Sequence, residues 1–106
     1  MKVLSLKNMK AGWFIGNFKP AALESKEFEV ACKYYNKGFK ARPHIHKVAS
    51  EITLVVYGRV KMCGQEIKEG ELVLLEPGEV GDFEALEDSA TVVVKMPSIP
   101  HDKYYQ

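Results

Sequence analysis

Residues 38–58 read GFKARPHIHKVASEITLVVYG, and this stretch decides the fold. Its pattern is G-x5-H-x-H-x4-E-x6-G, with two histidines one residue apart and a glutamate five residues after the second. Residues i and i+2 of a β-strand point to the same face, so His44 and His46 project together. Glu51 opens the next apolar run and joins them if the two strands are neighbours. Two imidazoles and a carboxylate form a three-point site for a divalent metal.

An H-x-H pair alone is a weak signal, because two histidines also occur this close together on a solvated strand. The glycines that bracket the stretch, Gly38 and Gly58, strengthen the interpretation. Each stands where a tight turn needs a positive φ, which glycine adopts without strain. The pattern therefore predicts a compact two-strand unit that carries a metal site.

This stretch resembles the first signature motif of the cupin superfamily at each of its defining positions, Gly38, His44, His46, Glu51 and Gly58. The second motif of that family reads G-x5-P-x-G-x2-H-x3-N, and residues 70–85 (GELVLLEPGEVGDFEA) match it less well. Gly81 stands where the family has its fourth ligand, a histidine. Ala85 stands where the family has an asparagine, and Pro77 is one place from the family proline.

The resemblance implies an all-β fold, a cupin-like double-stranded β-helix (jelly-roll β-barrel), formed as one domain by residues 1–106. Short strand-type runs bounded by Gly, Pro, Asn or Asp recur along the chain at 28–35, 52–57, 59–63, 65–67, 72–75, 80–86 and 91–96. Such spacing independently favours a sandwich or barrel. A single helical turn is allowed at 21–24. Residues 97–106 are expected to form an extended C-terminal tail, over the surface or onto a partner subunit.

By the same resemblance, His44, His46 and Glu51 are the metal ligands, at the mouth of the barrel. They leave open positions for water or a substrate. This ligand set suits Fe, Mn, Ni or Zn, and the sequence does not choose among them. The predicted lining of the cavity comprises Tyr34, Thr53, Tyr57 and Phe83.

Strand periodicity places two of these lining residues. The period of two from Glu51 puts Thr53 and Tyr57 on the inner face. In 28–35, FEVACKYY, the alternation groups Tyr34 with the apolar Val30 and Cys32, as in a half-buried strand.

Composition excludes several other classes of protein. The chain has 15 basic and 14 acidic residues, a net charge of +1, so electrostatics favours neither nucleic acid nor a membrane surface as a partner. No apolar run is long enough to span a bilayer, and residues 1–14 lack the apolar core of a signal peptide. A cytoplasmic protein with reduced cysteines is therefore expected.

Two functional classes remain open. The first is a metal-dependent cupin enzyme acting on a small polar metabolite, which the complete His-His-Glu set favours. The second is a non-catalytic cupin that binds a small ligand or serves as an accessory module, with or without metal. The missing fourth ligand and the lack of a clear acid–base pair favour the second class. A homodimer is expected in either case, because a 106-residue domain buries a limited share of its surface alone.

Overall fold

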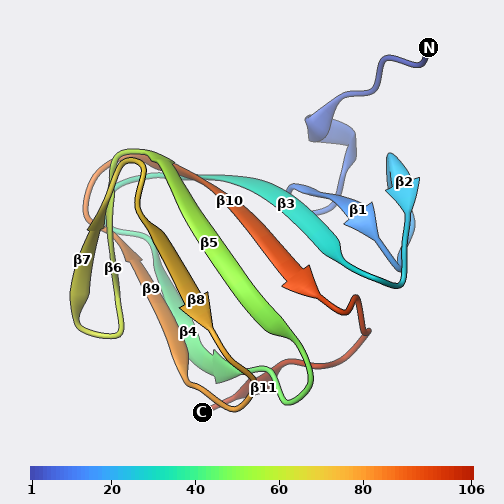
Figure 1. Ribbon diagram of the computed structural model, residues 1–106. Coiled ribbons are helices and arrows are strands. Elements are labelled where there is room, and N and C mark those ends of the chain that lie inside the picture. Colours follow the sequence, from blue (N-terminus) through green and yellow to red (C-terminus); the bar gives the residue numbers. More distant parts are fainter.

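The computed structural model describes residues 1–106 and is almost entirely built of β-strands (Figure 1). Its elements are η1 (Leu6–Asn8), β1 (Trp13–Gly16), β2 (Leu23–Glu24), β3 (Glu29–Tyr35), β4 (Lys40–Ile45), β5 (Ser50–Tyr57), β6 (Arg59–Met62), β7 (Gln65–Lys68), β8 (Leu72–Leu75), β9 (Gly81–Ala85), β10 (Ser89–Met96) and β11 (Tyr104–Tyr105). The helix-like element is the three-residue η1, and no helix has the length and apolarity needed to cross a membrane.

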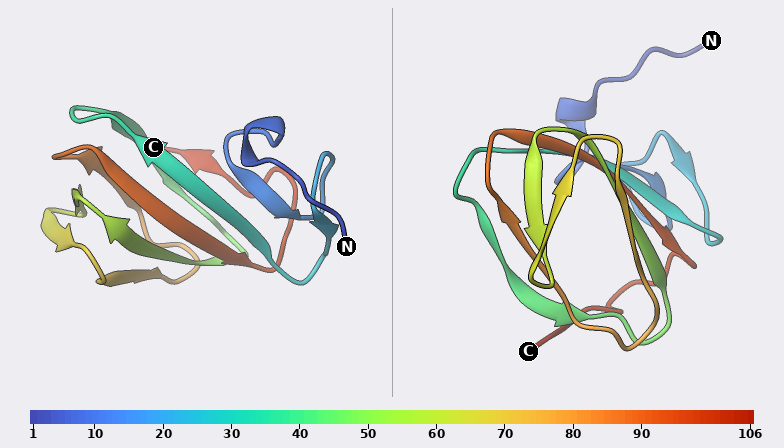
Figure 2. Two further views of the ribbon diagram at one scale, coloured as in Figure 1. Left: turned by 90° about the horizontal axis from the view of Figure 1, so that it is seen from above. Right: turned by 60° about the vertical axis from the view of Figure 1, so that its left-hand side comes forward.

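The strands form two sheets that face each other around a common interior (Figure 2). The six-stranded sheet has the order β2-β1-β3-β10-β5-β8, and the five-stranded sheet has the order β11-β4-β9-β6-β7. All neighbours are antiparallel except β1 and β2. Strands adjacent in a sheet are thus often distant in sequence, which is the jelly-roll arrangement. The predicted all-β double-stranded β-helix is confirmed.

A cluster of buried apolar side chains fills the barrel beside the β6–β7 hairpin. It comprises Val55, Val60, Met62 and Leu75, with Ile67, Val73 and Phe83 packed against it. Burying one aliphatic side chain of this size stabilises a fold by about 1.5–3 kcal/mol. The barrel therefore has an apolar core that does not depend on the polar residues of its interior.

One local expectation differs from the structure. The helical turn allowed at 21–24 is absent, and Leu23–Glu24 instead forms β2, which pairs with the end of β1. The C-terminal tail at 97–106 lies against the barrel. It folds back so that β11 pairs with β4, and both Ser98 and Asp102 are buried.

Candidate metal centre

The two histidines lie at the end of β4, where the regular pairing of that strand is interrupted. Pro43 has no amide hydrogen to donate, and the register of β4 against β9 shifts between Ala41 and His44. The strand ends at Ile45, so His46 is the first residue beyond it. Glu51 is the second residue of β5 and pairs with Leu75 of β8 on one side.

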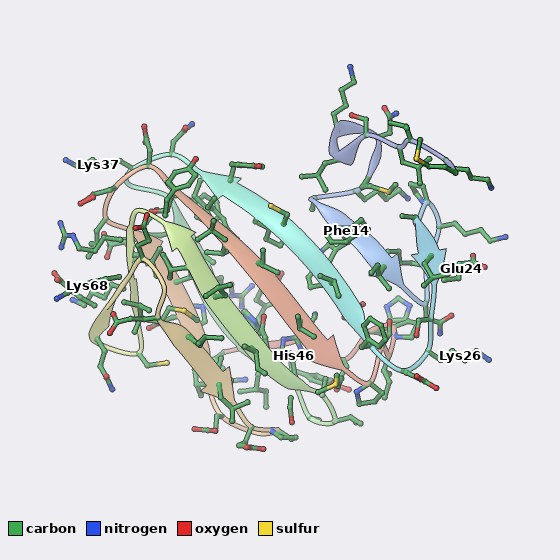
Figure 3. All side chains as sticks on the ribbon, turned by 45° about the horizontal axis from the view of Figure 1, so that its top comes forward. Phe14, Glu24, Lys26, Lys37, His46 and Lys68 are labelled. Atoms are coloured by element: carbon green, nitrogen blue, oxygen red, sulfur yellow. The ribbon has the colours of Figure 1, made fainter.

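The structure brings His44, His46 and Glu51 together inside the barrel. One ligand atom from each residue can be chosen so that all three lie within 4.8 Å of one another. The two imidazole rings meet edge to face, with centroids 5.1 Å apart. His46 is only 6% exposed and is labelled in Figure 3, where it lies beneath the strands of the six-stranded sheet.

Backbone carbonyls fix the tautomer of both rings. His46 Nδ1 donates to the carbonyl oxygen of Asp102 at 2.8 Å, and His44 Nδ1 donates to that of Arg42 at 3.2 Å. A carbonyl oxygen only accepts hydrogen bonds, so each neutral ring carries its hydrogen on Nδ1. The lone pair of each Nε2 is then free. Histidines that ligate metals are commonly held by such a bond from the other ring nitrogen.

The surroundings of the Nε2 atom of His46 indicate whether the cluster suits a metal. This atom is buried and has no hydrogen-bond partner. It lies 3.5 Å from Oε2 of Glu51, which is longer than a well-formed hydrogen bond. In the neutral tautomer, two acceptors face each other in a buried site, an arrangement that is costly unless a cation lies between them. The donor set therefore fits a divalent metal.

Charges around the cluster favour the protonation states that a metal needs. Burial lowers the pKa of His44 below its usual 6.5, which keeps the imidazole neutral. Burial alone would raise the pKa of Glu51. The interaction with His46 and the nearby positive charge of Lys95 outweigh burial, so that pKa lies below 4.5 and the carboxylate is ionised.

The cluster opens into a cavity of about 340 Å³ between the two sheets. Thr53 and Phe83 lie in its wall, as do Tyr35 and Thr91. Burial raises the pKa of Tyr35 to about 12, so its phenol remains a hydrogen-bond donor at neutral pH. The cavity thus combines the cluster with both aromatic and hydroxyl groups.

The prediction that Tyr34 and Tyr57 line this cavity was wrong. Tyr34 is 67% exposed and Tyr57 is 43% exposed, and neither lies in the cavity wall. In β3 the inward face is the other one, which carries Lys33 and Tyr35. In β5 the register shifts, because Val55 pairs with Thr91 while Tyr57, two residues later, pairs with the adjacent Ala90. This β-bulge ends the period of two that was counted from Glu51.

Gly81 lies directly opposite His44 in the β4–β9 pairing, as a residue in the slot of the fourth ligand should. No ligand atom can come from it. A Cβ atom there would approach Cδ1 of Leu75 to 2.8 Å, so a larger side chain would displace Leu75. Asp82 does not replace the missing ligand, because its carboxylate accepts the amide of Cys63 at 2.6 Å. The cluster therefore has three candidate ligands, and β9 supplies no fourth one.

Sequence reasoning missed Asp102, which ties the tail to the site. Its carboxylate accepts the backbone amides of Lys47, Val48 and Ala49 at 2.9–3.2 Å, and its own carbonyl holds His46. The side chain therefore organises the loop between β4 and β5. No local pattern in the sequence marks it, because its partners lie more than 50 residues away.

Comparison with known proteins adds to this geometry. No protein-family profile matches the chain, and no curated protein sequence matches it. Among solved structures, KdgF from Halomonas sp. is similar with a TM-score of 0.63 and 23% identity, over 69% of this chain and 72% of KdgF. A double-stranded β-helix protein from Klebsiella pneumoniae is similar with a TM-score of 0.68 and 18% identity, over 92% and 85%.

Oxalate decarboxylase from Bacillus subtilis, an enzyme with Mn(II) centres, is also similar. One of its structures has a TM-score of 0.66 and 22% identity, over 76% of this chain and 24% of the enzyme. The present chain thus corresponds to about a quarter of that protein. Likeness at these identities establishes a shared fold.

Proposed function

We propose that this chain, which has the cupin fold, is a small cupin that binds one divalent metal ion through His44, His46 and Glu51 and holds a small polar metabolite in the adjoining cavity. The observation that carries the proposal is the buried Nε2 atom of His46, which lacks a partner and faces a carboxylate oxygen 3.5 Å away. The metal can be Fe, Mn, Ni or Zn, because this donor set suits all four.

A metal with open positions would supply a Lewis acid to polarise an oxygen of the bound compound. The chain's own residues would bind and orient that compound. Tyr35 offers a phenol hydrogen, and Thr53 and Thr91 offer hydroxyl groups in the same cavity. No carboxylate or imidazole beyond the cluster stands in the cavity wall as an evident general base except Asp82, which caps the Cys63 amide. A non-catalytic cupin that binds a small ligand is therefore the second candidate.

Protein purified without a histidine tag tests the proposal. After removal of bound metal, titration with Co²⁺ or Zn²⁺ should saturate at one ion per chain. The visible spectrum of the Co²⁺ form should report nitrogen and oxygen ligands without sulfur. Occupancy should fall as the pH is lowered, because protons compete for the imidazoles. Failure to bind any of Fe²⁺, Mn²⁺, Ni²⁺, Co²⁺ or Zn²⁺ at neutral pH would overturn metal binding and leave the second candidate.

The proposal includes a homodimer, which the outer surface of the six-stranded sheet supports. A continuous apolar patch, the outer sheet patch, comprises Val92 and Val94 of β10, Ile52 and Leu54 of β5, and Leu72 and Leu74 of β8. Leu72 and Leu74 are 64% and 55% exposed. Monomers rarely expose contiguous apolar patches of this kind, and a two-fold related copy would cover it.

Light scattering during size-exclusion chromatography should give the mass of a dimer at micromolar concentration. The double substitution Leu72→Glu and Leu74→Glu should give a monomer, because charges would be buried in the interface. The control carries Val3→Glu and Leu4→Glu, two exposed apolar residues outside the outer sheet patch, and should remain dimeric. A wild-type monomer would contradict the assembly.

A cytoplasmic location and the absence of nucleic-acid or membrane partners complete the proposal. Cys32 and Cys63 are both free thiols, as in proteins of reducing compartments. The net charge of +1 offers no electrostatic attraction to polyanions.

A further inference from the structure

Three lysines stand in the wall of the barrel cavity, beside the metal-binding cluster. Lys33 on β3 faces inward, because it pairs with the fully buried Thr91 of β10. Lys95 on β10 and Lys103 in the tail line the same cavity. A second hollow of about 300 Å³ adjoins it and shares the last two lysines. The interior therefore concentrates positive charge in a chain that is nearly neutral.

Two of the three lysines have no acidic partner. Lys95 pairs with Glu29 at 3.2 Å, and Glu29 is further occupied by the hydroxyl of Ser98 at 3.1 Å. Neither Lys33 nor Lys103 forms an ion pair. Burial lowers the pKa of Lys33, and the like charges of Lys103 and Lys95 lower it further. Lys33 is partly buried and Lys103 is exposed, and the two lie near enough for their like charges to interact.

The other acidic side chains around the cavity are already engaged. The carboxylate of Asp82 caps the Cys63 amide, and that of Asp102 binds three amides of the β4–β5 loop. Glu51 belongs to the metal-binding cluster. The Nζ atoms of Lys33 and Lys103 lie over the rings of Trp13 and Tyr105, 5.1 and 5.4 Å from the ring centroids. An anionic ligand would add the ion pair that both lysines lack, and it would matter most for the partly buried Lys33.

A different part of the wall is apolar and aromatic. The rings of Tyr35, Phe39 and Phe83 pack with centroids 4.5–6.3 Å apart. The hydroxyl oxygen of Thr91 is buried between the sheets without a hydrogen-bond partner. Lysines, an unpaired hydroxyl and an aromatic surface in one cavity suit a compound with an anionic group and an apolar body.

We propose that the cavity binds a small organic acid, whose carboxylate is held by Lys33 and Lys103 and whose body lies against Phe39 and Phe83. This inference rests on the proposed function for the location of the ligand, because the same cavity contains the metal-binding cluster. The two lysines themselves do not ligate the metal, so acid binding and metal binding are measured separately.

The test compares acids with their uncharged amides of the same shape: acetate with acetamide, benzoate with benzamide, and succinate with succinamide. Binding is followed by ¹H–¹⁵N NMR titration of the metal-free and the Zn²⁺-loaded protein. At least one acid should bind about tenfold or more tightly than its amide. Hydrogen bonds between charged groups contribute more free energy than neutral ones, by an amount equivalent to about tenfold in affinity. That preference should shrink at high salt, which screens charges. Inorganic phosphate serves as a second anion and should bind more weakly than that acid.

Lys33→Met and Lys103→Met remove one charge each while keeping an unbranched side chain. Each should weaken binding of that acid about tenfold and leave amide binding unchanged. The control is Lys68→Met, which removes the same charge from β7, outside the cavity, where Figure 3 shows Lys68 at the edge of the molecule. This control should not affect acid binding.

The outcomes separate the two proposals. If Zn²⁺ binds but no acid is preferred over its amide, the organic-acid site is overturned and the metal site stands. The same conclusion follows if Lys68→Met lowers the affinity for the acid as much as Lys33→Met does. Tighter binding of phosphate than of any acid would also overturn it. If no metal binds but the acid preference depends on Lys33 and Lys103, the organic-acid site stands and the proposed metal function fails.

Discussion

Replacing both His44 and His46 with alanine is expected to abolish binding of a divalent metal while the barrel still folds. The two imidazoles supply two of the three clustered ligand atoms, and Glu51 alone offers a single carboxylate. The apolar core at Val55 and its neighbours contains neither histidine. Loss of the His46 hydrogen bond and of its buried ring should still lower the free energy of unfolding by about 1–3 kcal/mol.

Metal affinity is measured by competition with a chromophoric chelator, and stability by urea unfolding. The matched control is His101→Asn. His101 is the remaining histidine, lies outside the cluster and has φ +63°, a conformation that asparagine tolerates. The control should bind metal like the wild type. Unchanged metal stoichiometry in a folded double variant would show that the ligands are assigned to the wrong residues.

Substituting Asp102 with alanine is expected to weaken both the fold and the metal site. Asp102 is 8% exposed, and the change would leave the amides of Lys47, Val48 and Ala49 without their acceptor. A hydrogen bond to a charged group contributes about 1.5–3 kcal/mol, so the free energy of unfolding should fall by at least this much. The carbonyl that orients His46 would lose its anchor, and metal affinity should fall about 10–100-fold, as for other residues that hold a ligand.

Asp102→Asn separates charge from shape, because the amide keeps one acceptor oxygen. Burial alone would raise the pKa of Asp102, but the three amide hydrogen bonds and the proximity of His46 outweigh it, so the pKa lies below 3.8. A depressed pKa contributes stability above the unfolded value, and this contribution is lost as the pH falls through the folded value. Wild-type stability should therefore fall more steeply below about pH 4 than that of Asp102→Asn. Parallel curves for the two proteins would contradict this role.

The cluster could be predicted because its signal is local. The H-x-H spacing and the glutamate five residues later lie within one short stretch. The two-strand unit predicted from that stretch is wrong, because β4 and β5 lie in different sheets and do not pair. The three side chains meet because the two sheets face each other across the interior. Thr53, two residues from Glu51, lies in the cavity wall because strand periodicity places both on one face. Tyr57 does not, since a bulge intervenes, and the sequence carries no mark of the extra residue.

The inner face of β3 could not be chosen from hydrophobicity. The usual rule places the apolar face inward, which favoured Tyr34 together with Val30 and Cys32. In the structure these residues face outward, and Cys32 and Val30 pair with Val92 and Val94 of the outer sheet patch. The inner face instead carries Lys33. The rule fails here because the polar surface of this strand faces the cavity and the apolar surface continues the proposed dimer interface.

The contact between His46 and Asp102 has a consequence for how the protein is made. The two residues are 56 positions apart. A ribosome adds about 5–20 residues per second, so several seconds pass between the synthesis of His46 and that of Asp102, which holds it. During that interval the His46 imidazole of the nascent chain is free to rotate and to take either tautomer. By the proposed function, selective capture of an ion would wait until residue 102 is in place, and a ribosome-stalled fragment ending before residue 102 should not retain metal.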